Sequence, residues 1–277
     1  MLNVLKTENL TYTYEDGTKA LNNVSISIEK GDKTAFLGAN GSGKSTLFLC
    51  LNGILKPQHG RILFKDQPIE YSRKGLLGLR SKVGIVFQDP DNQLFSASVY
   101  QEISFGLMNL GISGQDAVKK VETIMEEMKI QPFRHKPTHL LSGGQKKQVS
   151  LADILVMEPE VIILDEPSSA LDPKHTKMIN DKLNSLPDSG VTVIISTHDV
   201  DYALEWADKV IVFKDGEVFA EGKTEDIFMN KELLKQTNLR QPSVIKLFIH
   251  LCERGILSRN LPVPQNFDTL ERYIIGT

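Results

Sequence analysis

Apolar and polar residues alternate along the first part of the chain, over residues 4–14 and again over residues 21–28. The two stretches flank the turn sequence Glu15-Asp16-Gly17. A period of two residues is typical of strands with one buried face, and a short glycine-containing turn joins such strands into a hairpin. The pattern therefore predicts antiparallel strands at the start of the chain.

Further along, three short apolar runs lack this alternation, at residues 34–37, 161–164 and 191–195. Runs of this kind are typical of strands buried on both faces of a parallel sheet. Apolar residues at helical spacing fill residues 44–51 after the first run and 174–186 between the other two. The chain is therefore predicted to be an α/β protein built from β-α-β units.

Helical periodicity also marks residues 113–128, 146–157 and 242–254. We expect one domain over residues 1–222, with a helical subdomain at about 89–157, and a C-terminal helical extension over 223–277. The apolar face of the last helix predicts packing against the chain's own core or contact with another subunit, and the sequence leaves both open.

Composition and charge limit the classes of function that the chain is expected to have. The net charge is −3 and the pI is near 6.1, so no overall charge favours nucleic acid, and we predict no nucleic-acid partner. No apolar run reaches the roughly 18 residues of a membrane-spanning helix and no signal peptide is evident, which predicts a cytosolic chain. Cys50 and Cys252 lack disulfide or metal-ligand spacing.

Residues 38–45 read Gly-Ala-Asn-Gly-Ser-Gly-Lys-Ser, between a predicted strand and a predicted helix. The pattern fits G-x-x-x-x-G-K-[ST], in which backbone N–H groups and a helix N-terminus hold phosphates. Lys44 is expected to reach the β- and γ-phosphates, and the Ser45 hydroxyl to coordinate Mg²⁺. The predicted nucleotide-binding residues are Gly38, Ala39, Asn40, Gly41, Ser42, Gly43, Lys44, Ser45 and Thr46.

Two acids, Asp165 and Glu166, follow the apolar run 161–164. Ligands of open α/β sheets bind at the carboxyl ends of strands, so Asp165 suits a Mg²⁺ shell. Glu166 is predicted to orient or deprotonate the water that attacks the γ-phosphate.

A second phosphate-type loop, Leu-Ser-Gly-Gly-Gln at 141–145, precedes the helix predicted at 146–157. Ser142 is expected to cap that helix. Because one nucleotide has little use for two such loops from one subunit, we infer that two subunits share each nucleotide.

The motifs together resemble an ABC ATPase cassette over nearly residues 1–222. They are the phosphate loop, LSGGQ at 141–145, VIILDE at 161–166, SALD at 169–172 and STHD at 196–199. The resemblance implies a P-loop NTPase fold with a RecA-like core, an antiparallel β-subdomain and an α-helical subdomain. It also implies ATP and Mg²⁺ as ligands and a head-to-tail dimer that ATP closes and hydrolysis reopens.

The same resemblance implies a role for residues whose function no local pattern indicates. Tyr14 matches the aromatic residue that stacks on adenine, with Tyr12 as the alternative. Gln88 matches a glutamine that touches Mg²⁺, and His198 a switch histidine on the γ-phosphate. A final set matches residues that act across the dimer: Ser142, Gly144 and Gln145 on the partner's nucleotide, and Asp172 in communication between subunits.

One position departs from the family pattern, since Gln148 stands where an arginine is usual, which leaves that helix's arginine contacts in doubt. The catalytic set of Lys44, Glu166 and His198, with Asp165 beside it, shows no departure. We therefore expect hydrolysis rather than a regulatory module that only binds nucleotide.

Residues 88–95 and the Ile-Ser-Phe-Gly at 103–106 resemble the cobalt-type and energy-coupling-factor branch, as does the C-terminal extension. That branch implies a transmembrane scaffold subunit, a substrate-binding membrane subunit, and a place on the cytoplasmic face of the membrane. Leu94 and Phe95 are expected to contact the membrane partner or to fill the subdomain core. The sequence leaves open the cargo (cobalt, nickel or a vitamin) and the choice of homodimer or heterodimer. The alternative is a soluble ABC ATPase of DNA repair or translation.

Overall fold

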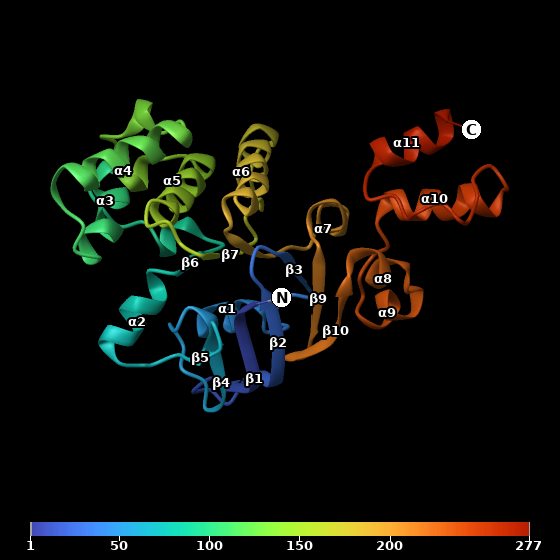
Figure 1. Ribbon diagram of the computed structural model, residues 1–277, viewed down its shortest axis with the longest axis horizontal. Helices are drawn as coiled ribbons and strands as arrows, with labels where there is room; N and C mark the ends of the chain where they lie inside the picture. The colour runs from blue at the N-terminus through green and yellow to red at the C-terminus, as the bar shows by residue number, and fades with distance from the viewer. Residues whose placement is uncertain (1, 277) are drawn as a thin grey trace.

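The computed structural model describes residues 2–276, which form two β-sheets, with the antiparallel sheet at the lower edge of the view and most helices above it (Figure 1). The first sheet is antiparallel, in the order β2-β1-β4-β5. Its strands are β1 (Asn3–Thr13), β2 (Lys19–Glu29), β4 (His59–Phe64) and β5 (Gln67–Pro68). The hairpin predicted at the start of the chain is confirmed, because β1 pairs antiparallel with β2.

The second sheet runs in the order β10-β9-β3-β8-β7-β6, and all its neighbours pair in parallel except β10 with β9. Its strands are β3 (Lys33–Leu37), β6 (Val83–Val86), β7 (Val161–Asp165), β8 (Thr192–Ser196), β9 (Lys209–Lys214) and β10 (Glu217–Lys223). The three predicted buried runs lie in β3, β7 and β8, and β8 pairs with both others. The parallel α/β core is therefore confirmed.

Alternate residues of β3 point to opposite faces of this sheet. Ala35 and Leu37 join one apolar cluster, and Phe36 joins the other, where it packs against Phe48 and Phe213. With both faces covered, the ends of the strands are the exposed part of the sheet. The carboxyl ends of β3, β7 and β8 lie at one edge, where the loops that follow them meet.

Helices next to the parallel sheet are α1 (Lys44–Leu51), α2 (Arg73–Arg80), α6 (Pro173–Ser185) and α7 (Val200–Trp206). A separate helical lobe, green in Figure 1, holds α3 (Val99–Asn109), α4 (Gly114–Glu127) and α5 (Gly143–Leu155). Both amphipathic helices predicted in this region are present, and α5 begins three residues earlier than expected. Single 3₁₀ turns lie at Pro90–Asn92, Gln131–Phe133, Thr138–Leu140 and Pro187–Ser189.

After β10, the described part of the chain forms four helices: α8 (Thr224–Met229), α9 (Lys231–Gln236), α10 (Ser243–Glu253) and α11 (Phe267–Ile275). On α10, Val244, Ile245 and Phe248 are buried in the apolar cluster that also covers the parallel sheet. The predicted apolar face therefore packs on the chain itself, while Leu247 of the same helix is exposed. Over residues 2–276, no helix has the length and apolar character needed to span a membrane.

Candidate functional site

The loop between β3 and α1 has a backbone that only glycine accommodates at two points. Gly38 and Gly43 have φ angles of 144° and 107°. A Cβ at Gly38 would lie 2.2 Å from the carbonyl oxygen of Phe213, and one at Gly43 would lie 2.4 Å from that of Ala20. The loop is therefore wedged between neighbouring backbones, which fixes the start of α1.

Lys44, the first residue of α1, is buried and turns its ammonium group back onto this loop. Nζ donates hydrogen bonds to the carbonyl oxygens of Gly38 at 2.7 Å and Ala39 at 3.0 Å, and to Oγ of Ser42 at 3.4 Å. Burial lowers the pKa of Lys44, and the charges of Glu166 and Asp165 oppose that shift. The adjacent Ser45 is exposed.

Two carboxyl groups face the loop from the end of β7. The hydroxyl of Ser196, at the end of β8, donates a hydrogen bond to Oδ1 of Asp165 and accepts one at 2.9 Å from the backbone N–H of Glu166. Glu166 has a φ of 47°, a left-handed conformation in which the chain turns sharply after the strand. This turn directs the Glu166 side chain toward the cleft instead of along the sheet.

The surroundings of Glu166 shift the pKa of its carboxyl group. Burial raises the pKa of its carboxyl group, and the neighbouring His198 opposes the shift. Oε1 lies 3.1 Å from Nε2 of His198, yet at this geometry it accepts no hydrogen bond within the described chain. A buried carboxylate oxygen without a hydrogen-bond donor is suited to bind a water molecule or another donor that enters the cleft.

These residues surround a cleft of about 240 Å³. Most predicted site residues line it: Tyr14, Asn40, Gly41, Ser42, Gly43, Lys44, Ser45, Thr46, Gln88, Asp165, Glu166 and His198. Gly38 and Ala39 lie behind this lining and provide the carbonyl oxygens that bind Lys44. The cleft thus joins a cationic phosphate loop to an acidic pair, as an enzyme acting on a nucleotide requires.

Of the two tyrosines, Tyr14 is the one at the cleft. The residue is 38 % exposed and its hydroxyl lies 3.0 Å from Oγ1 of Thr46. Tyr12 packs edge-on against Tyr14, with ring centroids 5.0 Å apart, and lies against the apolar cluster of the antiparallel sheet. Tyr14 therefore has the free ring surface needed to stack on a base.

A buried lysine that the sequence reasoning missed holds the segment containing Gln88. Nζ of Lys147, on α5, donates to the carbonyl oxygens of Phe87 at 2.9 Å and Gln88 at 3.0 Å. Burial lowers the pKa of Lys147 to about 8, against the charges of Asp165 and Asp89. The helical lobe is thereby connected to the edge of the cleft.

The LSGGQ segment lies at the N-terminus of α5. Ser142 caps this helix as predicted: its hydroxyl accepts from the Gln145 N–H at 3.3 Å, and Oε1 of Gln145 accepts from the Ser142 N–H at 3.2 Å. None of Ser142, Gly144 and Gln145 is among the described residues that line the cleft. The two phosphate-type loops of one chain therefore do not meet at one nucleotide.

Asp172 caps α6, accepting from the backbone N–H groups of Lys174 at 2.9 Å and His175 at 3.1 Å. His175 contacts the Asp172 carboxylate and lies against Gly144, where an added Cβ would come within 2.5 Å of the imidazole ring. His175 therefore links the LSGGQ segment to Asp172 of the SALD segment within one chain. The sequence analysis did not identify His175 as a site residue. The only indication in the sequence was that His175 lies three residues after Asp172.

Gln148, the departure from the family pattern, is buried under α4. Its amide donates to the carbonyl oxygen of Met128 at 3.1 Å and lies 2.8 Å from Sδ of Met178. The neutral amide thus satisfies the carbonyl at the C-terminus of α4 without placing a charge there.

The chemistry of the cleft fits a hard cation bound together with phosphate. Ser45, Gln88 and Asp165 present oxygen ligands around it, the type that Mg²⁺ prefers. Within residues 2–276, no group of three or more His, Cys, Asp and Glu side chains is placed to hold a metal ion unaided. A cation held by these three residues would need further oxygen ligands to complete its shell.

Comparison with known proteins agrees with this geometry. The ABC transporter family model matches residues 21–169. The chain is 49 % identical over 252 residues to the energy-coupling factor transporter ATP-binding protein EcfA2 of Clostridium perfringens, covering 91 % of this chain and 88 % of that one. It is 43 % identical over 264 residues to EcfA of Methanocaldococcus jannaschii, covering 95 % and 93 %.

Solved structures are similar as well. CbiO1 of Clostridium perfringens, part of the ABC transporter complex CbiONQ, superimposes with a TM-score of 0.75 at 48 % identity, covering 91 % of this chain and all of that one. The cassette MJ0796, solved as a dimer bound to ADP and Pi in a post-hydrolysis state, gives a TM-score of 0.73 at 30 % identity, covering 79 % and 98 %.

Proposed function

This chain belongs to the ABC transporter family, among the energy-coupling factor transporter ATP-binding proteins, and we propose how its residues perform that function. It is an ATPase that energises an importer. The observation that carries the proposal is the convergence of Lys44, Asp165, Glu166 and His198 on one cleft.

Lys44 and the backbone N–H groups of residues 38–46 bind the phosphates of ATP. The ammonium group, now on the carbonyl oxygens of Gly38 and Ala39, transfers its hydrogen bonds to β- and γ-phosphate oxygens. Charged acceptors bind an ammonium group more strongly than neutral carbonyl oxygens do. Tyr14 stacks on the adenine ring.

Ser45, Gln88 and Asp165 would hold Mg²⁺ together with phosphate oxygens, and the bound ion would supply positive charge against the phosphates. Ser196 keeps the Asp165 carboxylate in place through its hydrogen bond.

Glu166 accepts a proton from the water molecule that attacks the γ-phosphorus. Burial raises the pKa of this carboxyl group, which makes its carboxylate a stronger base toward the attacking water. His198, with Nε2 3.1 Å from the Glu166 carboxylate, contacts the γ-phosphate and orients it toward this water. The products are ADP and inorganic phosphate, with the proton first held on Glu166.

Ser142, Gly144 and Gln145 act on the nucleotide of a second subunit. They are not among the described residues that line the chain's own cleft, which supports this assignment, as does the dimer formed by the related cassette MJ0796. The working unit is a head-to-tail dimer of two copies, or of this chain with a related ATPase. Asp172, exposed at the start of α6 beside Gly144 and His175, communicates between the subunits.

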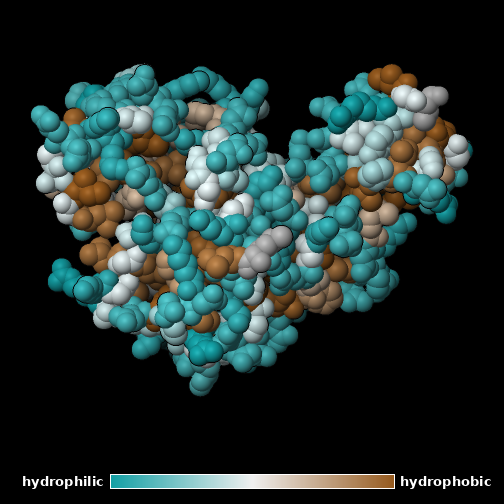
Figure 2. Space-filling model, viewed as in Figure 1, coloured by the Kyte–Doolittle hydropathy of each residue, from teal (hydrophilic) through white to brown (hydrophobic). Residues whose placement is uncertain are grey.

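An apolar surface before and along α3 binds the membrane subunits. Figure 2 shows hydrophobic residues exposed on this side of the helical lobe, and Phe95, Phe105 and Met108 are 67 %, 44 % and 68 % exposed. Phe95 and Phe105 pack edge to face at 5.0 Å and form one patch. We assign this patch to a transmembrane scaffold subunit, which places the chain at the cytoplasmic face of the membrane.

A separate substrate-binding membrane subunit selects the cargo, which we propose to be a cobalt or nickel ion or a vitamin. Residues 1–222 form the ATPase domain, with the helical subdomain at 89–157, and residues 223–277 form the extension. The relative CbiO1 belongs to a transporter complex, which supports this arrangement.

Two measurements on the full chain test the proposal. Purified protein should release phosphate from ATP only when Mg²⁺ is present. Tagged protein, recovered from detergent-solubilised native membranes, should bring with it a transmembrane scaffold and a small substrate-binding membrane protein. An active ATPase that recovers neither would contradict the importer role and favour a soluble ABC ATPase of DNA repair or translation.

A further inference from the structure

The C-terminal extension binds the helix that follows the switch histidine. The backbone N–H of Ser243 donates to Oδ1 of Asp201 at 2.6 Å, and the Ser243 hydroxyl donates to Oδ2 at 3.3 Å. Nη2 of Arg240 lies 2.7 Å from Oδ2 of Asp201 and 3.7 Å from Oδ1 of Asp199. We refer to these four residues, Asp199, Asp201, Arg240 and Ser243, as the α7 clasp.

The clasp acts on a segment continuous with the catalytic cleft. Asp199 caps α7 by accepting from the backbone N–H groups of Asp201 at 3.0 Å and Tyr202 at 3.1 Å. His198, which lines the cleft, is the residue directly before this cap. Any shift of the first turn of α7 therefore moves the backbone that carries His198.

Helix α7 has only seven residues, too few to be stable by its own hydrogen bonds. Val200, Ala203 and Leu204 anchor one side in the core, but its first turn on the outer side is held by the clasp. Toward its other end, Nδ2 of Asn266 lies 3.4 Å from Oε1 of Glu205, a second contact from the extension.

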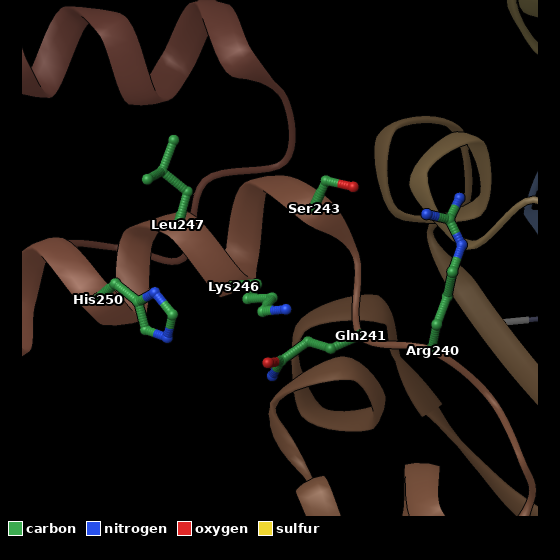
Figure 3. A pocket seen from close by; sticks show the side chains of 6 residues that line it. All are labelled: Arg240, Gln241, Ser243, Lys246, Leu247 and His250. Atoms are coloured by element: carbon green, nitrogen blue, oxygen red, sulfur yellow. The ribbon is translucent and has the colours of Figure 1, made fainter.

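Arg240 lies at the rim of a surface pocket, where its guanidinium group pairs with Asp201. Figure 3 shows its side chain lying apart from those of Lys246 and His250, which line the same pocket from α10. The extension is already attached to the core by apolar residues such as Ile245 and Phe248. The polar clasp is therefore not needed to bury the extension, and its contacts instead fix the start of α7.

We propose that the α7 clasp positions His198 for hydrolysis, with Asp201 and Arg240 as positioning residues. The inference rests on the proposed ATPase mechanism, in which His198 orients the γ-phosphate. Loosening the clasp leaves the phosphate loop and Tyr14 unchanged, so ATP binding is retained while turnover falls. A movement of the extension thus alters hydrolysis without contact with the nucleotide.

The test compares Arg240→Gln and Asp201→Asn with the unchanged full-length chain. Each should lower kcat for ATP about threefold to fivefold, as expected when a partly exposed ion pair is lost. The KM for ATP should stay within about twofold. Arg240→Lys should recover most of the lost turnover, and Arg254→Gln, at an exposed arginine of the same extension, should match the unchanged chain. Unchanged kcat in both clasp variants would overturn the proposal.

Hydrogen exchange without ATP provides a readout independent of activity. Backbone amides over residues 198–206 should exchange faster in Arg240→Gln, while those of α10 and the thermal midpoint stay unchanged. Faster exchange throughout the extension with a lower midpoint would indicate a merely structural contact and overturn the positioning role. If the unchanged chain hydrolyses no ATP, the proposed function fails, and the exchange of α7 still decides whether the clasp holds this helix.

Discussion

Ser196 and Asp165 lie opposite each other in the parallel pairing of β8 with β7, and the Ser196 hydroxyl donates a hydrogen bond to the Asp165 carboxylate. The same hydroxyl accepts from the backbone N–H of Glu166 at 2.9 Å. One side chain from a neighbouring strand therefore orients both acids of the cleft, the proposed Mg²⁺ ligand and the proposed base.

Ser196→Ala should weaken metal binding more than nucleotide binding. It frees the Asp165 carboxylate and leaves the buried N–H of Glu166 without a partner, a loss of about 1–3 kcal/mol. We expect the Mg²⁺ concentration for half-maximal ATPase activity to rise about tenfold, measured by titrating Mg²⁺ at saturating ATP. Ser185→Ala, on the exposed part of α6, serves as the control. An unaltered Mg²⁺ titration would remove Ser196 from this role.

Glu166→Gln should bind ATP and assemble into the dimer but hydrolyse about 10²–10⁴ times more slowly, because the amide cannot take a proton from water. Phosphate release and size-exclusion chromatography with ATP measure the two effects. Glu271→Gln, on the exposed face of α11, should behave as the unchanged protein. Near-normal turnover of Glu166→Gln would exclude the carboxylate as the base.

Leu94 and Phe95 should respond differently to replacement by serine. Phe95 is 67 % exposed, so Phe95→Ser should leave the ATPase activity of the isolated chain intact while lowering transport in the assembled importer about tenfold or more. Leu94 is half-buried against the apolar cluster, so Leu94→Ser should lower the free energy of unfolding by about 1–3 kcal/mol. Chemical unfolding and uptake assays distinguish them. Equal transport by Phe95→Ser and the unchanged importer would contradict the docking surface.

Asp153 gives the stability of the fold a dependence on pH. Burial raises its pKa to about 7 from a reference of 3.8, a hydrogen bond from Gln93 opposes the shift, and the charge of Glu102 adds to it. Between these two values the folded chain binds more protons than the unfolded chain, so the free energy of unfolding contributed by Asp153 falls as the pH rises.

Asp153→Asn removes this titration and should stabilise the chain by roughly 1–3 kcal/mol at about pH 8, with little effect at about pH 4. Urea unfolding at several pH values measures the difference. Asp181→Asn, at an exposed acid in the middle of α6, should give no such pH-dependent gain. A constant difference between Asp153→Asn and the unchanged chain across the pH range would contradict the assignment.

The sequence predicted those parts of the cleft whose geometry is local. Gly38, Gly43 and Lys44 act within eight consecutive residues, so their spacing alone indicates how the loop surrounds a phosphate. The strands β3, β7 and β8 were equally predictable, because burial on both faces leaves continuous apolar runs. Helix ends differed by a few residues, since capping interactions and not periodicity decide them.

Contacts between distant residues were not predictable in the same way. Lys147 reaches the carbonyl oxygen of Phe87 across 60 positions of sequence, and Ser243 reaches Asp201 across 42. Neither pair shows a local pattern, because the sequence does not distinguish this lysine or serine from one that is exposed and makes no such contact. Ser196 lies within a motif, but its hydrogen bonds follow only from the register of β7 with β8.

The hydrogen bonds of Lys44 to its own loop have a consequence for how nucleotide arrives. The ammonium group of Lys44 donates hydrogen bonds to the carbonyl oxygens of Gly38 and Ala39. When a nucleotide binds, phosphate oxygens replace these carbonyl oxygens as the acceptors. The glycine backbone around it is held by Phe213 and Ala20 and has no need to rearrange. Nucleotide binding then requires only that the Lys44 side chain change its conformation. The rate of binding should therefore be closer to the diffusion limit than if the loop had to refold.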